Sequence, residues 1–405
     1  MRGFSYSLIV LTTLVSSSAL ADDWRQFRGN NTDGVADDTP IPTEWDEGKN
    51  IAWKVPLVGR GLSCPIIVGD RVFLTSCSGY RQDRLHVTCF AAKDGSILWE
   101  RQFWATGRTN SHPKMSNASS TPASDGKRIF ALYSSNDLVC LDLDGNLEWF
   151  RGLTVDFPNA SNSLGMSSSP IVVGDTLITQ IENDSQSLAL GIDVATGESR
   201  WTKERPKRAN WTSPAVLRGT KPDEDLALLQ SSAGLAAVNP RTGAVVFNYE
   251  NGASTIPSAT VSSRTAFIPS NGIVAFQFAD GSANPEILWK EDKLKPGTGT
   301  PTVYRDMLYC VNNAGVVFAA DAKTGNIKWQ VRLEGPFSSS PVAAAGHLVL
   351  FNEKGLGQVV KLTEGEKGEI VSKNDLGEVI LCTPAIANGA IYVRSDQHLW
   401  KLALP

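Results

Sequence analysis

Residues 300–329 read TPTVYRDMLYCVNNAGVVFAADAKTGNIKW. Four short runs of β-favouring residues follow one another here, with turn residues between them, and an Asp-x-x-Thr-Gly element precedes the last run. Runs of this length separated by turns predict one sheet of four antiparallel strands. The proline at position 301 suits the start of the first strand, where its missing N–H removes no ladder hydrogen bond.

The same unit recurs along the chain. Eight times a proline follows a small, hydroxylated or apolar residue and precedes a short apolar run. The pairs are Cys64-Pro65, Thr121-Pro122, Ser169-Pro170, Ser213-Pro214, Ile256-Pro257, Thr300-Pro301, Ser340-Pro341 and Thr383-Pro384. Successive prolines are 40 to 57 residues apart, a repeat length typical of a closed ring of four-stranded blades. The sequence therefore predicts an all-β, eight-bladed β-propeller.

Both ends of the chain contribute to the last blade. After Pro384 only three strands are predicted, whereas residues 51–55 have the spacing of an outer strand with no proline unit before them. We expect residues 51–55 to complete blade 8, because this pairing removes sheet edges that an open array would expose. Residues 22–405 are then expected to form a single domain, preceded by a signal peptide at residues 1–21.

The Asp-x-x-Thr-Gly element predicts the contacts between blades. The aspartate can accept backbone N–H groups while the glycine adopts a positive φ. We interpret the element as a turn and not as a calcium loop, because its oxygen spacing differs from that of an EF-hand. A large ring follows the turn glycine and is expected to be buried between neighbouring blades. These rings are Trp99, Trp149, Trp201, Phe247, Trp289 and Trp329.

Composition and the first residues limit the class of protein. Hydrophobic residues make up 41% of the chain and charged residues 20%, as in a soluble all-β protein. The net charge of -4 argues against a nucleic-acid partner. Residues 1–21 combine Arg2, a short apolar run and a small-residue site, which predicts a secretory signal cut after Ala21. We expect a periplasmic or secreted monomer without a transmembrane segment.

Six cysteines follow the predicted signal, and their spacing matches no metal motif. Cys64 and Cys382 stand beside the first and last repeat prolines, so ring closure would bring their strands together. The sequence leaves open whether they form a disulfide, which export would permit. Cys89 and Cys140 occupy equivalent positions in successive units and are expected to be small apolar core residues.

The combination of inner-strand proline, Asp-x-x-Thr-Gly and tryptophan resembles the PQQ-repeat β-propeller superfamily from about Ile51 to Leu402. That superfamily includes quinoprotein alcohol dehydrogenases and the outer-membrane assembly factor BamB. The resemblance implies two alternatives: a non-catalytic binding scaffold, or an oxidoreductase of reduced size that uses PQQ with calcium. The chain lacks the adjacent cysteines of those dehydrogenases and a Cys-x-x-Cys-His haem site. We therefore favour the scaffold, with no catalytic residue, cofactor or metal.

The candidate binding surface combines a polar insertion between the first two units with the hydroxyl clusters before the inner prolines. A propeller presents such loops around one central funnel. We expect this funnel to bind a protein partner or a small polar ligand of the cell envelope, with a glycan as a further alternative. The candidate contact residues are Arg60, Arg108, His112, Lys114, Ser119, Ser167, Trp211 and Ser338.

Overall fold

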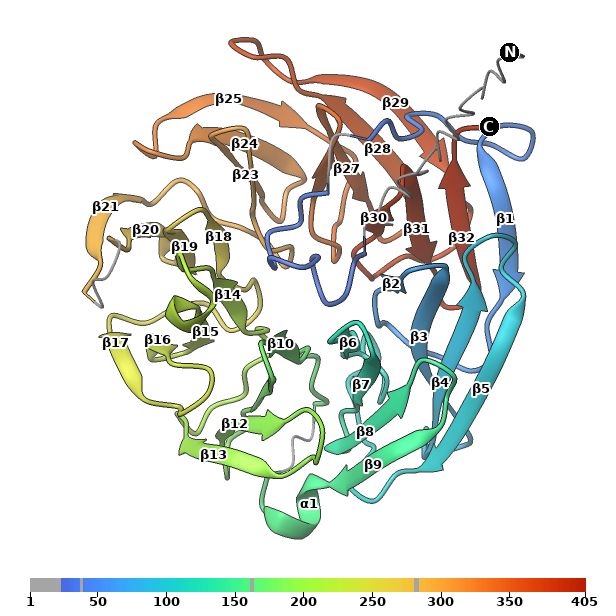
Figure 1. Cartoon of the computed structure of the whole chain (residues 1–405). Helices are drawn as coiled ribbons and strands as arrows, with labels where there is room; N and C mark the ends of the chain where they lie inside the picture. Colours follow the sequence, from blue (N-terminus) through green and yellow to red (C-terminus); the bar gives the residue numbers. More distant parts are fainter. Residues whose placement is uncertain (1–22, 37–38, 161–163, 280–283) are drawn as a thin grey trace, which may run out of the picture.

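The computed structural model describes residues 23–36, 39–160, 164–279 and 284–405. Its strands form eight sheets of four antiparallel strands, which surround a central axis as the blades of a propeller (Figure 1). The predicted eight-bladed architecture is confirmed. The predicted signal at residues 1–21 lies outside the described residues. Within them, no helix is long and apolar enough to cross a membrane.

Blades 1 to 4 each contain four consecutive strands, which run in order from the centre outward. Blade 1 contains β2 (Ile66–Val68), β3 (Arg71–Ser78), β4 (Arg84–Ala91) and β5 (Ile97–Trp104). Blade 2 contains β6 (Ala123–Ser124), β7 (Arg128–Leu132), β8 (Asp137–Asp142) and β9 (Leu147–Gly152). Blade 3 contains β10 (Ile171–Val173), β11 (Thr176–Ile181), β12 (Leu188–Asp193) and β13 (Ser199–Glu204). Blade 4 contains β14 (Ala215–Leu217), β15 (Leu226–Ser231), β16 (Gly234–Val238) and β17 (Val245–Tyr249).

Blades 5 to 7 have the same composition, and the connections add a short helix α1 (Leu153–Asp156) and a 3₁₀ turn (Pro222–Glu224). Blade 5 contains β18 (Thr260–Ser262), β19 (Thr265–Ser270), β20 (Gly272–Gln277) and β21 (Glu286–Glu291). Blade 6 contains β22 (Thr302–Tyr304), β23 (Met307–Val311), β24 (Val316–Asp321) and β25 (Ile327–Arg332). Blade 7 contains β26 (Val342–Ala344), β27 (His347–Phe351), β28 (Leu356–Lys361) and β29 (Glu369–Asp375).

Blade 8 joins the two ends of the chain, as the sequence predicts. It contains β30 (Ala385–Ala387), β31 (Ala390–Arg394), β32 (His398–Ala403) and, as its outer strand, β1 (Ile51–Pro56). Strand β1 is antiparallel to β32, with Pro56 opposite His398 and Ile51 opposite Leu402. Figure 1 shows the blue β1 beside the red β32. This pairing closes the ring at the seam between blades 8 and 1.

The fifth unit differs from the sequence prediction. In the other units the inner strand begins directly after the proline, whereas β18 begins at Thr260, three residues after Pro257. The pair equivalent to Ser213-Pro214 is therefore Ser258-Ala259, and the assignment of Ile256-Pro257 is wrong. Alanine can begin the strand here because the position needs no proline. Proline is tolerated at a strand start, where its missing N–H removes no ladder bond, but it makes no hydrogen bond of its own.

The large rings lie between blades, as predicted. Trp149 of blade 2 donates its indole N–H to Val194 O of blade 3 (3.1 Å), and Trp289 of blade 5 donates to Ala322 O of blade 6 (2.9 Å). Trp53 of β1 donates in the same way to Ala92 O across the closing seam (3.1 Å). At Gly197, which has a φ of +75°, a Cβ would come within 2.7 Å of the Trp149 ring. Each glycine turn of this kind receives the ring of the preceding blade.

The Asp-x-x-Thr-Gly element is a turn, as predicted. The Asp193 carboxylate accepts the N–H groups of Ala195 (2.9 Å) and Thr196 (3.0 Å). Asp321 accepts those of Lys323 and Thr324 in the same geometry. The carboxylates are therefore already used by the backbone that they shape.

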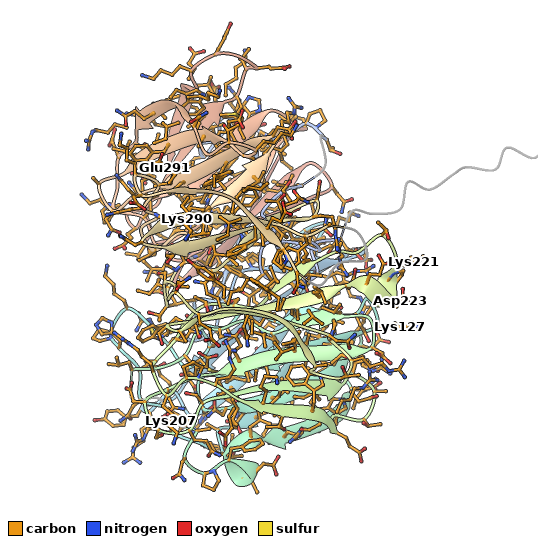
Figure 2. All side chains as sticks on the ribbon, turned by 90° about the vertical axis from the view of Figure 1, so that its left-hand side faces the viewer. Lys127, Lys207, Lys221, Asp223, Lys290 and Glu291 are labelled. Carbon is orange, nitrogen blue, oxygen red and sulfur yellow. The ribbon has the colours of Figure 1, made fainter. Side chains whose placement is uncertain are left out.

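The ring has two faces, seen edge-on in Figure 2. Lys127 and Lys221 stand in turns that follow innermost strands, and they lie on one face, here called the turn face. Lys207 stands in the connection between blades 3 and 4 and lies on the opposite face, here called the connection face. The connections between blades therefore converge on a different end of the channel from the inner-strand turns.

Residues 24–36, here called the N-terminal segment, cross the channel at the centre of the ring (blue in Figure 1). The innermost strands leave one edge of N–H and C=O groups facing the channel, and such edges need partners when buried. The segment supplies acceptors to the same position in five blades. The N–H groups of Ile67, Ser124, Val172, Val216 and Ala343 donate to Trp24 O, Arg25 O, Gln26 Oε1, Thr32 Oγ1 and Gly34 O at 2.8 to 3.0 Å.

Arg28 fixes the segment to two further blades, 5 and 6. Its guanidinium is 1% exposed and donates to Pro301 O (2.6 Å), Thr300 O (3.1 Å) and Thr302 Oγ1 (3.1 Å). It also donates to Thr260 Oγ1 (3.3 Å). Burial lowers the pKa of Arg28 to about 10, so the group remains charged at neutral pH. Sequence analysis did not identify this closure of the channel.

We predict that Arg28→Ala destabilises the protein by roughly 2–4 kcal/mol, because it leaves several buried carbonyl groups without a donor. Arg25→Ala is the matched control, since Arg25 belongs to the same segment but its side chain is 43% exposed and pairs with Asp23. The control should change the unfolding free energy by less than about 0.5 kcal/mol. Urea unfolding followed by tryptophan fluorescence measures both values. Equal effects of the two variants would contradict this role for Arg28.

Candidate functional site

A ring of hydrogen bonds joins the blades around the channel. In seven blades, the residue two positions before the inner strand donates its N–H to the side-chain oxygen of the equivalent residue in the next blade. The bonds from Cys64 through Ser340 measure 2.9 to 3.0 Å. At the eighth position Cys64 stands in place of the hydroxyl residue, and the Thr383 N–H acts on its sulfur and lowers the pKa of the thiol. These eight residues, here called the inner ring, are Cys64, Thr121, Ser169, Ser213, Ser258, Thr300, Ser340 and Thr383.

This arrangement gives the predicted hydroxyl clusters a structural role. Each inner-ring oxygen accepts one backbone N–H, so the hydroxyl satisfies a buried donor of the neighbouring blade. Other hydroxyls in the clusters are also occupied, since Ser119 donates to Ser116 O (2.8 Å) and Ser339 to Phe351 O (2.6 Å). These hydroxyl groups therefore first serve the hydrogen bonds within and between blades, and binding a ligand is secondary.

A cavity of about 390 Å³ opens on the connection face, and the inner ring forms the deeper part of its wall. The part of the wall nearer the mouth is a second ring, two residues before each inner-ring position. This outer ring contains Leu62, Ser119, Ser167, Trp211, Ile256, Thr298, Ser338 and Leu381. Phe27 of the N-terminal segment lines the deep end. The cavity is therefore a pocket with one mouth and not an open channel.

The outer ring alternates in polarity around the mouth. Leu381 and Leu62 form one apolar pair on blades 8 and 1, and Trp211 and Ile256 form another on blades 4 and 5. Hydroxyl pairs separate them, with Ser119 and Ser167 on blades 2 and 3 and Thr298 and Ser338 on blades 6 and 7. The inner ring has a hydroxyl residue at seven of its eight positions, whereas the outer ring is mixed, so the shape and chemistry of the mouth come from the outer ring.

The first connection, residues 105–122, reaches over one side of the mouth. His112 donates its N–H to Leu164 O (2.9 Å), and Lys114 Nζ forms an ion pair with Glu353 of blade 7 (2.9 Å). Ser338 also donates to Glu353 (2.8 Å). Burial alone would raise the pKa of the Glu353 carboxyl, but hydrogen bonds from Lys114 and Ser338 outweigh it and lower the pKa.

The structure brings most of the predicted contact residues together and separates two. His112, Lys114, Ser119, Ser167, Trp211 and Ser338 line the cavity. Trp211 also donates its indole N–H to Gly165 O (2.9 Å), which links the connections on either side of blade 3. Arg60 does not line the cavity; it supports the first connection through Pro113 O (2.7 Å). Arg108 is exposed and lies outside the lining.

Sequence analysis missed the apolar part of the lining. Leu62, Leu164, Ile256 and Leu381 are single apolar residues in connections, and such residues have no periodic pattern. Ile256 precedes Ser258 by two residues, as Trp211 precedes Ser213. Alignment of the unit on Pro257 instead of Ser258 hides this equivalence. Phe27 belongs to a segment without any repeat.

The donor set of the cavity does not fit a calcium-bound quinone. Among the described residues that line the cavity none is Asp or Glu, whereas calcium prefers carboxylate and carbonyl oxygens. Over the described part of the chain, no group of three or more His, Cys, Asp or Glu side chains could hold a metal. The lining offers hydroxyls, two thiols, one imidazole and one ammonium group.

Comparisons with known proteins agree with the fold. The model of a family described as outer membrane protein assembly factor BamB matches residues 27–177, 101–266 and 270–367. The first two matches overlap, as a repeat can align in more than one register. No curated protein matches the sequence.

Solved structures also resemble this one. BamB from Moraxella catarrhalis has a TM-score of 0.64 and 17% identity, covering 87% of this chain and 96% of that one. A europium-containing methanol dehydrogenase has a TM-score of 0.71 and 13% identity, covering 95% and 98%. Quinohemoprotein alcohol dehydrogenase from Comamonas testosteroni has a TM-score of 0.65 and 12% identity, covering 95% and 81%. Identities this low show a shared fold and leave the activity undecided.

We predict that Ser213→Ala costs about 1–3 kcal/mol, because the buried Ser169 N–H loses its acceptor. Ser213→Thr should stay within about 0.5 kcal/mol, since threonine occupies the same position in three other blades. Ser167→Ala is a further control, because Ser167 lines the same cavity outside the inner ring. Chemical denaturation of the three variants measures the differences. A stability loss for Thr as large as for Ala would contradict the acceptor role.

Proposed function

Because the chain belongs to the family described as outer membrane protein assembly factor BamB, we propose that it is a binding scaffold whose central pocket receives a segment of a protein partner. The family is described as an assembly factor, and assembly requires contact with other proteins. No catalytic residue is proposed. The pocket supports this function through its lining, its depth and the exposure of its rim.

The exposed apolar side chains at the mouth are the observation on which the proposal depends. Leu164 is 45% exposed and Ile256 is 47% exposed, and both line the pocket beside Trp211. Apolar side chains that gather around a concave site favour an interaction surface. An apolar or aromatic side chain of a partner can enter the pocket and remove this surface from water, at roughly 25 cal/mol per Å².

The polar groups of the mouth suit the backbone of such a segment. A bound peptide must pair its N–H and C=O groups when water is displaced. Thr298, Ser338 and the Lys114–Glu353 ion pair stand on one side of the pocket, while the apolar pairs stand on either side of them. An extended segment can therefore direct apolar side chains into the pocket and its backbone toward the hydroxyls.

A quinone-dependent oxidoreductase is the alternative that the similar dehydrogenase structures raise. Its calcium would need carboxylate ligands, and none of the described lining residues provides one. The inner-ring hydroxyls are occupied by the blades, so they are poor candidates for replacing those ligands. We therefore propose that the protein works without PQQ or calcium.

We further propose that the protein works outside the cytoplasm, as the description of its family and the pattern of residues 1–21 suggest. Expression of the full sequence in a Gram-negative host should give a processed protein whose N-terminal residue is Asp22. N-terminal sequencing of the extracytoplasmic fraction measures this. Recovery of the uncut chain in the cytoplasm alone would contradict export.

We predict that the protein selects peptides with apolar anchors from a phage-displayed library of random linear peptides. Ile256→Asp and Leu164→Asp should each weaken the selected peptides by roughly tenfold or more, because an added carboxylate must be buried on binding. Val155→Asp is the matched control, since Val155 is 78% exposed in α1, outside the pocket. Fluorescence anisotropy with labelled peptides measures the affinities.

The same preparation separates the alternatives. Addition of PQQ and calcium with an alcohol and an electron-accepting dye should give no turnover above background. Steady dye reduction that depends on PQQ would favour the oxidoreductase. Binding to immobilised polysaccharides, with no peptide selected, would favour a glycan-binding module. Peptide binding that is equally strong in Ile256→Asp, Leu164→Asp and Val155→Asp would place the contact outside the pocket.

A further inference from the structure

The seam between blades 8 and 1 departs from the repeat at two adjacent positions. Cys64 occupies the inner ring, where the other seven blades have Ser or Thr. Cys382 stands directly before an inner-ring residue, where five blades have Ser or Thr. The two departures meet at the one seam that is closed by residues far apart in the sequence.

The two thiols are in contact and border the pocket. They belong to one buried cluster, each influences the titration of the other, and no disulfide joins them. Both line the cavity, and each is 4% exposed, whereas Cys89, Cys140 and Cys310 are 0% exposed within apolar clusters. A small reagent that enters the mouth can therefore reach Cys64 and Cys382 while the buried cysteines remain protected.

Arg394 of β31 places a buried positive charge beside this pair. The side chain is 1% exposed, and Nη1 donates to Ser63 Oγ (2.7 Å) and Thr75 O (2.7 Å), which are neutral acceptors. Its Nε and Nη2 groups are buried and have no partner within the described residues. Cys382 Sγ lies 3.1 Å from Arg394 O. An unpaired buried cation favours an anion nearby.

This environment distinguishes the two sulfurs. Burial alone would raise the pKa of the Cys64 thiol, but hydrogen bonds with Cys382, Thr121 and the Thr383 N–H, aided by the Arg394 charge, outweigh it and lower the pKa. The pKa of Cys382 is raised by its hydrogen bond to Cys64 and by burial. The hydrogen-bond geometry supports the same distinction, because the Cys382 thiol donates its proton to Arg394 O, which leaves Cys64 as the attacking sulfur.

We propose that Cys64 and Cys382 are a redox-active pair that closes into a disulfide across the seam between blades 8 and 1, with a low-molecular-weight disulfide as the oxidant. The Cys64 thiolate attacks one sulfur of the reagent, the reagent S–S bond breaks, and one thiol leaves. Cys382 then loses its proton and attacks Cys64, which releases the second thiol. The protein loses two electrons and two protons, and the reagent gains both as two thiols.

The disulfide would be a second closure of the ring, and a covalent one. It links the seam that β1 and β32 close by hydrogen bonds alone, and it encloses most of the chain in one loop. Long loops give a large reduction of unfolded-state entropy. Oxidation should therefore raise the melting temperature by roughly 3–6 °C.

The test uses the full exported chain, reduced and then treated with bis(2-hydroxyethyl) disulfide under native conditions. Peptide mapping by mass spectrometry without reductant should find one cross-link, between the Cys64 and Cys382 peptides. Cys382→Ser should stop at a mixed disulfide of 2-mercaptoethanol on Cys64, and Cys64→Ser should form no adduct at either position. Cys64→Ser is expected to fold, because serine is the inner-ring residue of several other blades.

Cys77→Ser is the matched control, because Cys77 also lies near Arg394 but its sulfur contacts Arg60 O and Gln82. This variant should form the same cross-link as the natural sequence. The proposal is wrong if Cys64 and Cys382 stay reduced until denaturant is added, if the cross-link maps to other cysteines, or if oxidation fails to raise the melting temperature. None of these results would bear on peptide binding by the pocket.

Discussion

Neighbouring blades are held in register by a single repeated hydrogen bond, from the backbone N–H before each inner strand to the hydroxyl of the next blade. Seven such bonds of nearly equal length and one N–H to sulfur contact complete the circle. A buried N–H without an acceptor is costly, so each blade fixes the position of the next. The tryptophan contacts at the outer seams add apolar burial, while the inner ring sets the radius at which the pocket walls stand.

The N-terminal segment turns this ring from a channel into a pocket. The inner strands need partners for their free edges, and residues 24–36 provide them to seven blades. Backbone carbonyls serve blades 1, 2 and 7, the Gln26 and Thr32 side chains serve blades 3 and 4, and the Arg28 guanidinium serves blades 5 and 6. Once that end is filled, only the connection face can admit a partner. The closure also leaves Phe27 at the deep end, so the pocket has an apolar side chain at its base as well as apolar pairs at its rim.

The fold was predictable because its signals are local and repeated. The proline, the Asp-x-x-Thr-Gly turn and the tryptophan each act within one blade or between two neighbours, so eight copies reinforce one another. Alignment on proline failed at Ile256-Pro257 because the hydroxyl of Ser258, and not the ring of a proline, makes the contact that the blade needs. The N-terminal segment was not predictable, since its contacts join single residues to strands far away in the sequence. Arg28, a charged residue among carbonyl groups, shows no pattern that marks it as buried.

The positions that break the repeat are the ones that can distinguish this propeller from others. The inner ring must supply an acceptor in every blade, so its chemistry is almost constant. The outer ring lies two residues away, makes no such bond and varies from Leu62 through Ser167 and Trp211 to Thr298. The long first connection and the thiols at Cys64 and Cys382 also depart from the repeat, and all of them border the same pocket. The repeated residues therefore form the framework of the pocket, and the residues that depart from the repeat determine which partner fits.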